Sequence, residues 1–275
     1  MRQFKIIHPF DQHTMSHLQL IQNENGVWTL LLQRPDQLNA LSDEMVKDLH
    51  GMLEEIHHSS ACRVLILTGA GRGFCAGFDL SLADDAPGSS SGETAAWMRR
   101  QENFATLITQ IKSLPQPVIA AVNGPANGAG FALSLACDVR MASESASFNA
   151  AFIKVGMSSC DMGVSYLLPR CVGASHAFDI MLTGRMVLAN EALQIGLISR
   201  LLDPLALKVE AEKLAQQLTE NDAFAVWMTK RGMWANLEAS SFSAAIELEN
   251  RTQILARSTG VLKTKALAFK SKNRS

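Results

Sequence analysis

A glycine-rich turn between an apolar run and a helical pattern is the first stretch that could do chemistry. The run Val118–Val122 predicts a buried strand, the residues of 123–130 are small, and Phe131, Leu133 and Leu135 then have helical spacing. A helix N-terminus presents unpaired N–H groups and the positive end of a dipole, and glycine lets a ligand approach the backbone closely. The turn therefore suits an anion or a polarised carbonyl, although a tight turn without a ligand would have the same sequence.

A second loop of small residues follows another predicted strand. The strand covers 63–68, and the loop runs from Gly69 to Leu80. Two such loops could each direct one backbone N–H at the same oxygen, which would form an oxyanion hole. Each donor of this kind stabilises a transition state by roughly 3 kcal/mol.

Several segments, taken in order, resemble the crotonase superfamily, also called the enoyl-CoA hydratase/isomerase family. They are R-P-D-Q-L-N-A-L-S, G-F-C-A-G-F-D-L, I-A-A-V-N-G-P-A-N-G-A-G, A-C-D-V-R-M-A-S, and L-T-G-R followed by A-L-Q-I-G-L-I. The resemblance covers about Leu18 to Leu202. It implies an α/β crotonase (ClpP-like) fold, in which a spiral of repeated ββα units over 1–202 precedes a C-terminal helical oligomerisation region over 203–275. It also implies a homotrimer or a dimer of trimers.

The resemblance further implies an acyl-CoA substrate. In this family two backbone N–H groups hold the thioester carbonyl, which makes the α-carbon acidic, and a carboxylate then moves protons or activates water. By position, the donors would be the amides of Phe78 and Ala129. Coenzyme A is part of the substrate, and no other cofactor is expected. Substrate contacts are expected at Gln37, Asn39, Ala40, Ala76, Asp79, Leu80, Gly128, Ala132, Phe152 and Met162.

The chain departs from the hydratase pattern at two positions. Enoyl-CoA hydratases of this family use two glutamates to hold and activate a water molecule. The matching positions here are Ala132 and Phe152, so both acids are missing. This departure argues against hydration by the usual mechanism.

Three carboxylates remain between Val118 and Arg170. Asp138, at a predicted helix-to-strand junction, is expected to fix the turn, and Glu144, in a polar turn, is expected to be exposed. Asp161 precedes a predicted helix, so it could cap that helix, or it could project into an apolar pocket where desolvation would raise its pKa. The resemblance favours the second role, because D-M-G-V-S-Y-L-L-P-R is similar to the segment where several members keep an essential acid.

The leading hypothesis is an enoyl-CoA isomerase of the Δ3,Δ2 type, with Asp161 taking a proton from C2 and returning it at C4. The first alternative is an enoyl-CoA hydratase with a non-standard acid, either Asp161 or an acid from the loop 83–92, which is expected to be mobile. The second is a non-catalytic acyl-CoA-binding subunit. A 4-chlorobenzoyl-CoA dehalogenase is disfavoured. Those enzymes need a histidine on the helix that matches 95–113, and this segment has none.

Local patterns predict the elements that position these residues. Strands over 18–22 and 27–32 form a hairpin, and Ser42 begins a helix that runs to about His57. Helices are also expected over 95–113 and 128–136. The pattern then turns helical over 164–171, 176–182, 189–195, 205–219, 223–237, 241–256 and 262–270.

Composition restricts the partners and the compartment. The 275 residues are 47% hydrophobic and carry a formal net charge of −1, so a basic nucleic-acid-binding face is not expected. No run approaches the roughly 20 apolar residues that span a bilayer, and the N-terminus lacks the apolar core of a signal peptide. Five cysteines without a C-x-x-C pair suit reduced thiols in the cytoplasm. No metal site is expected.

Overall fold

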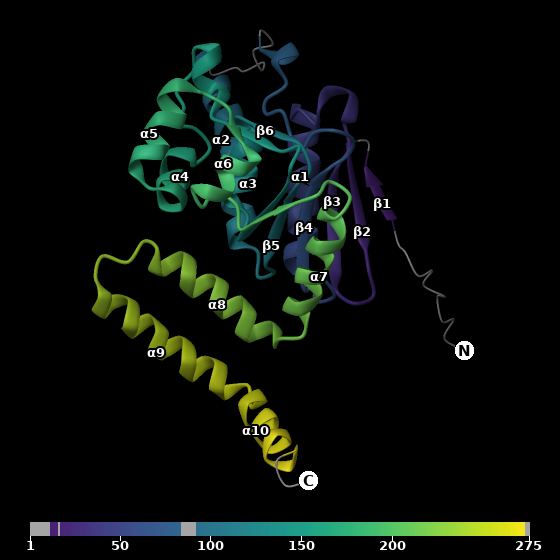
Figure 1. The fold of residues 1–275 in the computed structure, drawn as a ribbon, viewed down its shortest axis with the longest axis vertical. Helices are drawn as coiled ribbons and strands as arrows, with labels where there is room; N and C mark the ends of the chain where they lie inside the picture. The colour runs from purple at the N-terminus through teal and green to yellow at the C-terminus, as the bar shows by residue number, and fades with distance from the viewer. Residues whose placement is uncertain (1–11, 16, 84–91, 273–275) are drawn as a thin grey trace.

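The computed structural model describes residues 12–15, 17–83 and 92–272. Two β-sheets form its centre, and helices surround them (Figure 1). Residues 84–91, which make up most of the loop expected to be mobile, lie outside the described residues, as does the N-terminal segment 1–11.

The larger sheet has seven strands in the order β1-β2-β3-β4-β5-β7-β10. The first three strands pair antiparallel, and the pairs from β3 to β10 are parallel. The predicted hairpin is present, with Gly26 at φ +81° donating its N–H to the Asn23 carbonyl at 3.1 Å. The strands are β1 (Gln12–Met15), β2 (Leu18–Gln22), β3 (Val27–Leu32), β4 (Val64–Gly69), β5 (Val118–Val122), β7 (Val139–Ser143) and β10 (Arg200–Leu202).

The smaller sheet has three short strands, β6 (Pro125–Asn127), β8 (Ser147–Asn149) and β9 (Val187–Leu188), in that order. Cys75 extends it through an isolated bridge to Ala126. The chain therefore passes from β4 to Cys75, from β5 to β6 and from β7 to β8, each time leaving the large sheet for the small one. This repeated step is the expected spiral of ββα units.

The two faces of the large sheet are covered by different helices. Side chains alternate along a strand, so Leu65 and Leu67 of β4 join the cluster beneath α1 (Asp43–His58), α2 (Glu93–Ser113) and α3 (Ala129–Ala136). Val64 and Ile66 point to the opposite face, where α7 (Leu207–Thr219) buries Leu207, Ala211 and Ala215. Although α7 follows residue 202, it is part of the packed core.

Helix α1 begins as the sequence predicts. The Ser42 hydroxyl accepts a hydrogen bond from the Met45 N–H at 3.2 Å, and Asp43 and Glu44 occupy the first turn. This cap fixes the start of the helix that follows the R-P-D-Q-L-N-A-L-S segment.

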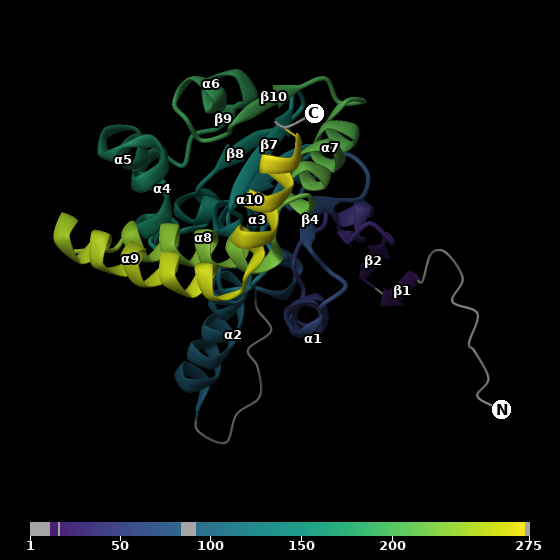
Figure 2. The same cartoon turned by 90° about the horizontal axis from the view of Figure 1, so that it is seen from below.

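The remaining helices follow the predicted ones within a few residues. Between β8 and β10 lie the 3-10 helix η3 (Ala151–Val155), α4 (Val164–Val172), α5 (Ala174–Thr183) and α6 (Ala189–Gln194). Figure 1 shows α8 (Ala223–Asn236), α9 (Phe242–Ser258) and α10 (Val261–Lys272) extending away from the sheets, and α9 packs along α8, as Figure 2 also shows. Several large apolar side chains of these helices are exposed, among them Phe242, Ile254, Leu262 and Phe269. No helix in the described part of the chain is long and apolar enough to cross a membrane.

Candidate active site

One pocket of about 410 Å³ brings together the residues to which the sequence assigns the chemistry. Phe78, Ala129 and Asp161, which come from three separate parts of the chain, all line it. The walls are mostly apolar and aromatic, and the other lining residues are Leu80, Ala83, Trp97, Arg100, Gln101, Phe104, Phe152, Val155, Met157 and Met162.

The backbone N–H of Phe78 points away from the neighbouring segment that contains Leu41. Leu41 forms a parallel bridge with Phe78, and the bonds of this bridge run from the Leu41 N–H to the Gly77 carbonyl (2.7 Å) and from the Asp79 N–H to the Leu41 carbonyl (3.0 Å). In this pattern the N–H of Phe78 itself points to the opposite side. Ala129 is the first residue of α3, so the helix supplies no acceptor for its N–H.

The two loops that carry these donors are in backbone contact. Gly77 has φ +98°, and a Cβ placed there would lie 2.7 Å from the Asn127 carbonyl oxygen and 3.3 Å from the Ala129 nitrogen. The Asn127 N–H donates to the Cys75 carbonyl at 3.0 Å. Only glycine at position 77 allows this approach without strain, and it brings the segment of Phe78 beside the start of α3.

Two asparagine side chains donate hydrogen bonds to carbonyl groups of the first loop. The Asn39 amide donates to the Ala70 and Gly73 carbonyls, at 3.0 and 2.8 Å. The Asn123 amide donates to the same Gly73 carbonyl at 3.2 Å and to the Gly71 carbonyl at 3.0 Å. Asn39 is fully buried, so its side chain holds the loop in place and is not exposed to a substrate.

An ion pair fixes the segment just after Phe78. The Arg34 guanidinium lies 2.9 Å from the Asp79 carboxylate and also donates to the Ala40 carbonyl. Hydrogen bonds from Ser81, and then Arg34, lower the pKa of Asp79. Asp79 is thus held as an anion that anchors the loop, and it does not line the pocket.

Asp161 projects from a tight turn immediately before α4. The Val164 N–H donates to the Asp161 carbonyl at 2.8 Å, and the two residues between them, Met162 and Gly163, have φ of +42° and +76°. A side chain at positive φ costs on the order of 1 kcal/mol, so the buried Met162 adopts an unfavourable backbone conformation beside Asp161. The N-cap of α4 is Gly163 and has no side-chain hydrogen bond. The carboxylate of Asp161 therefore does not cap the helix.

The surroundings of the Asp161 carboxyl favour its neutral form. Burial raises the pKa of Asp161, while hydrogen bonds from the Met162 backbone and the Gln101 side chain partly oppose that increase. The carboxyl is half-buried, and its Oδ1 accepts a hydrogen bond from Gln101 Nε2. A carboxyl with a raised pKa is a better proton acceptor and is a candidate for proton exchange with a substrate.

The two positions that carry glutamates in hydratases supply no acid here. Ala132 lies in the interior of α3 and is fully buried. Phe152 lies on η3, and its ring carbon Cε1 would be 3.7 Å from a Cβ on Gly128, which has φ +50°. Phe152 lines the pocket.

The other expected substrate residues are distributed around the site. Leu80 and Met162 line the pocket, whereas Gln37, Ala40, Ala76 and Gly128 lie outside its lining. Gln37 is exposed on the short helix η1 (Pro35–Gln37), and Ala40 is buried.

Sequence reasoning missed the contribution of α2. Trp97, Arg100, Gln101 and Phe104 line the pocket, and they are spaced as residues i, i+3, i+4 and i+7 of one helix face. That spacing is visible in the sequence. We did not identify this face from the sequence, because its side chains are charged, polar and aromatic and do not form an apolar stripe.

The two remaining carboxylates have structural or solvent-exposed positions. Asp138 accepts hydrogen bonds from the Val118 N–H at 2.7 Å and from Trp234 Nε1 at 2.8 Å, which confirms that it fixes the junction. Glu144 is exposed, as expected. Within the described residues, no three His, Cys, Asp or Glu side chains are close enough to hold a metal ion.

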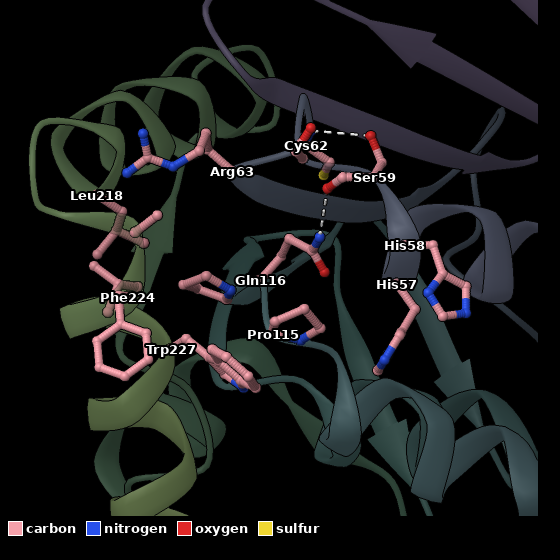
Figure 3. A pocket seen from close by; sticks show the side chains of 14 residues that line it. His57, His58, Ser59, Cys62, Arg63, Pro115, Gln116, Leu218, Phe224 and Trp227 are labelled. Carbon is pink, nitrogen blue, oxygen red and sulfur yellow. Dashed lines mark hydrogen bonds between the residues drawn. The ribbon is translucent and has the colours of Figure 1, made fainter. Parts of the chain in front are cut away.

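A second pocket, of about 420 Å³, lies between α8 and the ends of α1 and α2 (Figure 3). Phe224 and Trp227 stand on one side of it and His57 and His58 on the other. Its lining has no carboxylate, and burial raises the pKa of the Cys62 thiol to about 12. This pocket lacks the acid that the chemistry requires.

Comparison with known proteins identifies the family to which the chain belongs. Residues 22–274 match the model of a family described as enoyl-CoA hydratase/isomerase. A Mycobacterium tuberculosis protein named "Probable enoyl-CoA hydratase EchA12" is 39% identical over 83% of this chain and 80% of its own length. The Escherichia coli 1,2-epoxyphenylacetyl-CoA isomerase is 36% identical over 90% of this chain and 94% of its own. The crystal structure of a monofunctional enoyl-CoA isomerase from M. smegmatis superposes with a TM-score of 0.72 at 37% identity, covering 84% of this chain and 99% of that one. This chain is therefore an enzyme of the enoyl-CoA hydratase/isomerase family, the crotonase superfamily that its sequence resembles.

Proposed function

We propose that the protein isomerises enoyl-CoA thioesters by moving a double bond between C3–C4 and C2–C3 of the acyl chain. One observation carries this proposal. Among the described residues that line the pocket of Phe78 and Ala129, Asp161 is the only carboxylate. A single group that removes a proton from one carbon and returns it at another is sufficient to move a double bond, whereas the usual hydration uses two acids.

In the proposed reaction the Phe78 and Ala129 N–H groups hold the thioester oxygen. Asp161 removes a proton from C2, and the electron pair of the broken C–H bond delocalises onto that oxygen as a dienolate. When the carbonyl re-forms, the electrons shift toward C4, which takes the proton back from Asp161. The product has its double bond between C2 and C3 and the same atoms as the substrate.

The pocket walls support this assignment. Phe78, Phe104 and Phe152 give the acyl chain apolar surroundings, which limit water at the dienolate. Burial raises the pKa of Asp161 toward the range in which a carboxyl both accepts and donates protons. The similar M. smegmatis protein is named an enoyl-CoA isomerase, and the E. coli relative is named an isomerase of 1,2-epoxyphenylacetyl-CoA. Coenzyme A enters as part of the substrate, and we propose no other cofactor.

Hydration of 2-enoyl-CoA with Asp161 as the acid is the second candidate. The M. tuberculosis relative, which is named a hydratase, favours it. The absence of both usual glutamates, at Ala132 and Phe152, disfavours it.

Product mass separates the two reactions. The purified protein is incubated with a 3-enoyl-CoA and, separately, with a 2-enoyl-CoA, and the products are analysed by mass spectrometry and chromatography. Isomerisation converts one enoyl-CoA into the other with unchanged mass. Addition of one water to the 2-enoyl-CoA, with no interconversion of the two enoyl-CoAs, would contradict the proposal.

We also propose that the chain assembles as a trimer or a dimer of trimers in the cytoplasm. The exposed apolar residues of α9 and α10, such as Phe242, Ile254, Leu262 and Phe269, support an assembly through these helices. Light scattering should then give a mass of three or six chains, and a monomer would contradict it.

A further inference from the structure

We propose that Gln101 of α2 is a positioning residue for Asp161, which it holds in the orientation needed to reach the bound acyl chain. This inference rests on the proposed acid–base role of Asp161. It adds a residue to which neither the sequence motifs nor the comparisons assign any role.

The contact joins two distant parts of the chain. Gln101 Nε2 donates a hydrogen bond to Asp161 Oδ1, and the two residues are 60 positions apart. Gln101 lies between Trp97 and Phe104 on the face of α2 that lines the pocket. The hydrogen bond therefore forms at the wall of the pocket where the acyl chain would lie.

The backbone around Asp161 is fixed, but its side chain needs a further constraint. The turn closed by the Val164 N–H sets where the Cα–Cβ bond of Asp161 points. Rotation about the side-chain torsions would still leave the carboxylate several staggered positions. A donor from α2 selects one of these positions and leaves the second carboxylate oxygen for the substrate.

Within the described part of the chain, other side chains of α2 make the contacts of this helix with the core. The buried residues Phe104, Leu107, Ile108 and Ile111 anchor α2 against the core. Among the described residues, the Asp161 carboxylate is the hydrogen-bond partner of the Gln101 side chain.

The charges around Asp161 are few. Arg100 is the other charged residue that lines the pocket, and its Nε donates to Asp43 at 2.8 Å. The elements packed nearby carry further charges, on Arg99 and Glu102 of α2, Lys154 of η3 and Arg170 of α4. None of them is among the causes that shift the pKa of Asp161, which are burial and the hydrogen bonds from Met162 and Gln101.

The test compares three variants at position 101 by the pH dependence of isomerisation. Gln101→Ala removes the donor, and Gln101→Met removes it while keeping the length of the side chain. In both, kcat should fall by up to about 100-fold through misplacement of the carboxylate, and KM should change little. The kinetic pKa of the rising limb should increase, because a hydrogen bond to the ionised form is lost.

Gln101→Glu places a second carboxylate beside the first, so the kinetic pKa should rise further than in Gln101→Ala. Glu102→Ala is the matched control, since Glu102 neighbours Gln101 on α2, is exposed and does not line the pocket. Its pH profile should be that of the wild type.

Two results would overturn the inference. One is an unchanged kcat and pH profile in Gln101→Ala and Gln101→Met. The other is a loss of kcat in proportion to a lowered melting temperature, with an unchanged kinetic pKa, since this would indicate a structural role alone. Failure of the proposed function gives a different result, because the wild-type protein itself would then interconvert neither enoyl-CoA, whereas full isomerisation by Asp161→Asn would refute only the proton-carrying role of Asp161.

Discussion

The ammonium of Lys230 lies 2.9 Å from a carboxylate oxygen of Asp138, and this buried pair attaches α8 to the rest of the molecule. Lys230 is 7% exposed and also donates to the Gln116 and Ile111 carbonyls, at 2.9 and 3.3 Å. Trp234, one turn further along α8, donates to the same carboxylate. Burial lowers the pKa of Lys230, and the Asp138 charge partly restores it.

Replacing Lys230 with methionine should lower the free energy of unfolding by about 3–5 kcal/mol. The substitution keeps most of the side-chain volume but leaves the Asp138 carboxylate buried without its cation. Urea unfolding followed by tryptophan fluorescence measures the loss. Lys208→Met is the control, because Lys208 is 80% exposed in its pair with Glu212 and should change stability by less than about 1 kcal/mol. Equal losses of unfolding free energy in the two variants would show that the buried pair stabilises the protein no more than the exposed pair does.

Replacing Asp161 with asparagine should lower the rate of isomerisation by about 100- to 10,000-fold, because the variant keeps the size and polarity of the side chain but loses the base. Affinity for an acyl-CoA should change little, since the Phe78 and Ala129 amides remain. Rapid-mixing kinetics and calorimetry give the two quantities. A variant with wild-type turnover would rule out Asp161 as the proton carrier.

The same substitution should affect stability in a pH-dependent way. Because burial raises the pKa of Asp161, the folded state binds more protons than the unfolded state between about 3.9, the ordinary aspartate value, and the raised pKa. The wild type should therefore lose stability relative to Asp161→Asn as the pH rises through this window, and the difference should stay constant above it. Melting temperatures of both proteins from pH 4 to pH 8 test the sign. A difference that changes in the opposite direction would contradict the raised pKa.

Replacing Gly77 with alanine should lower kcat strongly while the protein still folds. The new Cβ would meet the Asn127 carbonyl at 2.7 Å and force the loop of Phe78 away from α3. One oxyanion donor misplaced in this way costs about 100- to 1,000-fold in kcat. Gly51→Ala is the control, because Gly51 lies in α1 with nothing within 4 Å of a Cβ, and alanine there should stabilise the helix by about 1 kcal/mol. Wild-type turnover in Gly77→Ala would mean that the contact between the loops does not matter for catalysis.

Periodicity predicted much of the fold because most elements are long or strongly apolar. The strand Val118–Val122, the Ser42 cap and the helices from Val164 onward are as expected, with ends shifted by a few residues. The strands β6, β8 and β9 have two or three residues each, too few to show an alternation. The short edge strand β1 was missed as well.

The sequence could suggest site residues within recognisable segments, but not contacts that depend on how distant segments meet. The resemblance of two glycine-rich loops and of the segment before α4 to the crotonase superfamily predicted roles for Phe78, Ala129 and Asp161. All three residues line one pocket, and their roles stay predictions. The contact between Gln101 and Asp161 depends on how α2 packs beside that turn. The pair of Lys230 and Asp138 likewise joins residues that no local pattern connects.

The two groups that would hold the thioester oxygen are main-chain amides, whereas the group that would move the proton is a side chain. A main-chain donor survives substitution of its own residue, so the polarising half of the site depends on how the loops of Gly77 and Gly128 are folded. The proton-handling half depends on which side chains the turn at Asp161 and the α2 face present. A few substitutions at Asp161 and on the pocket face of α2 could therefore change the reaction during evolution. The main-chain groups that activate the carbonyl would stay in place.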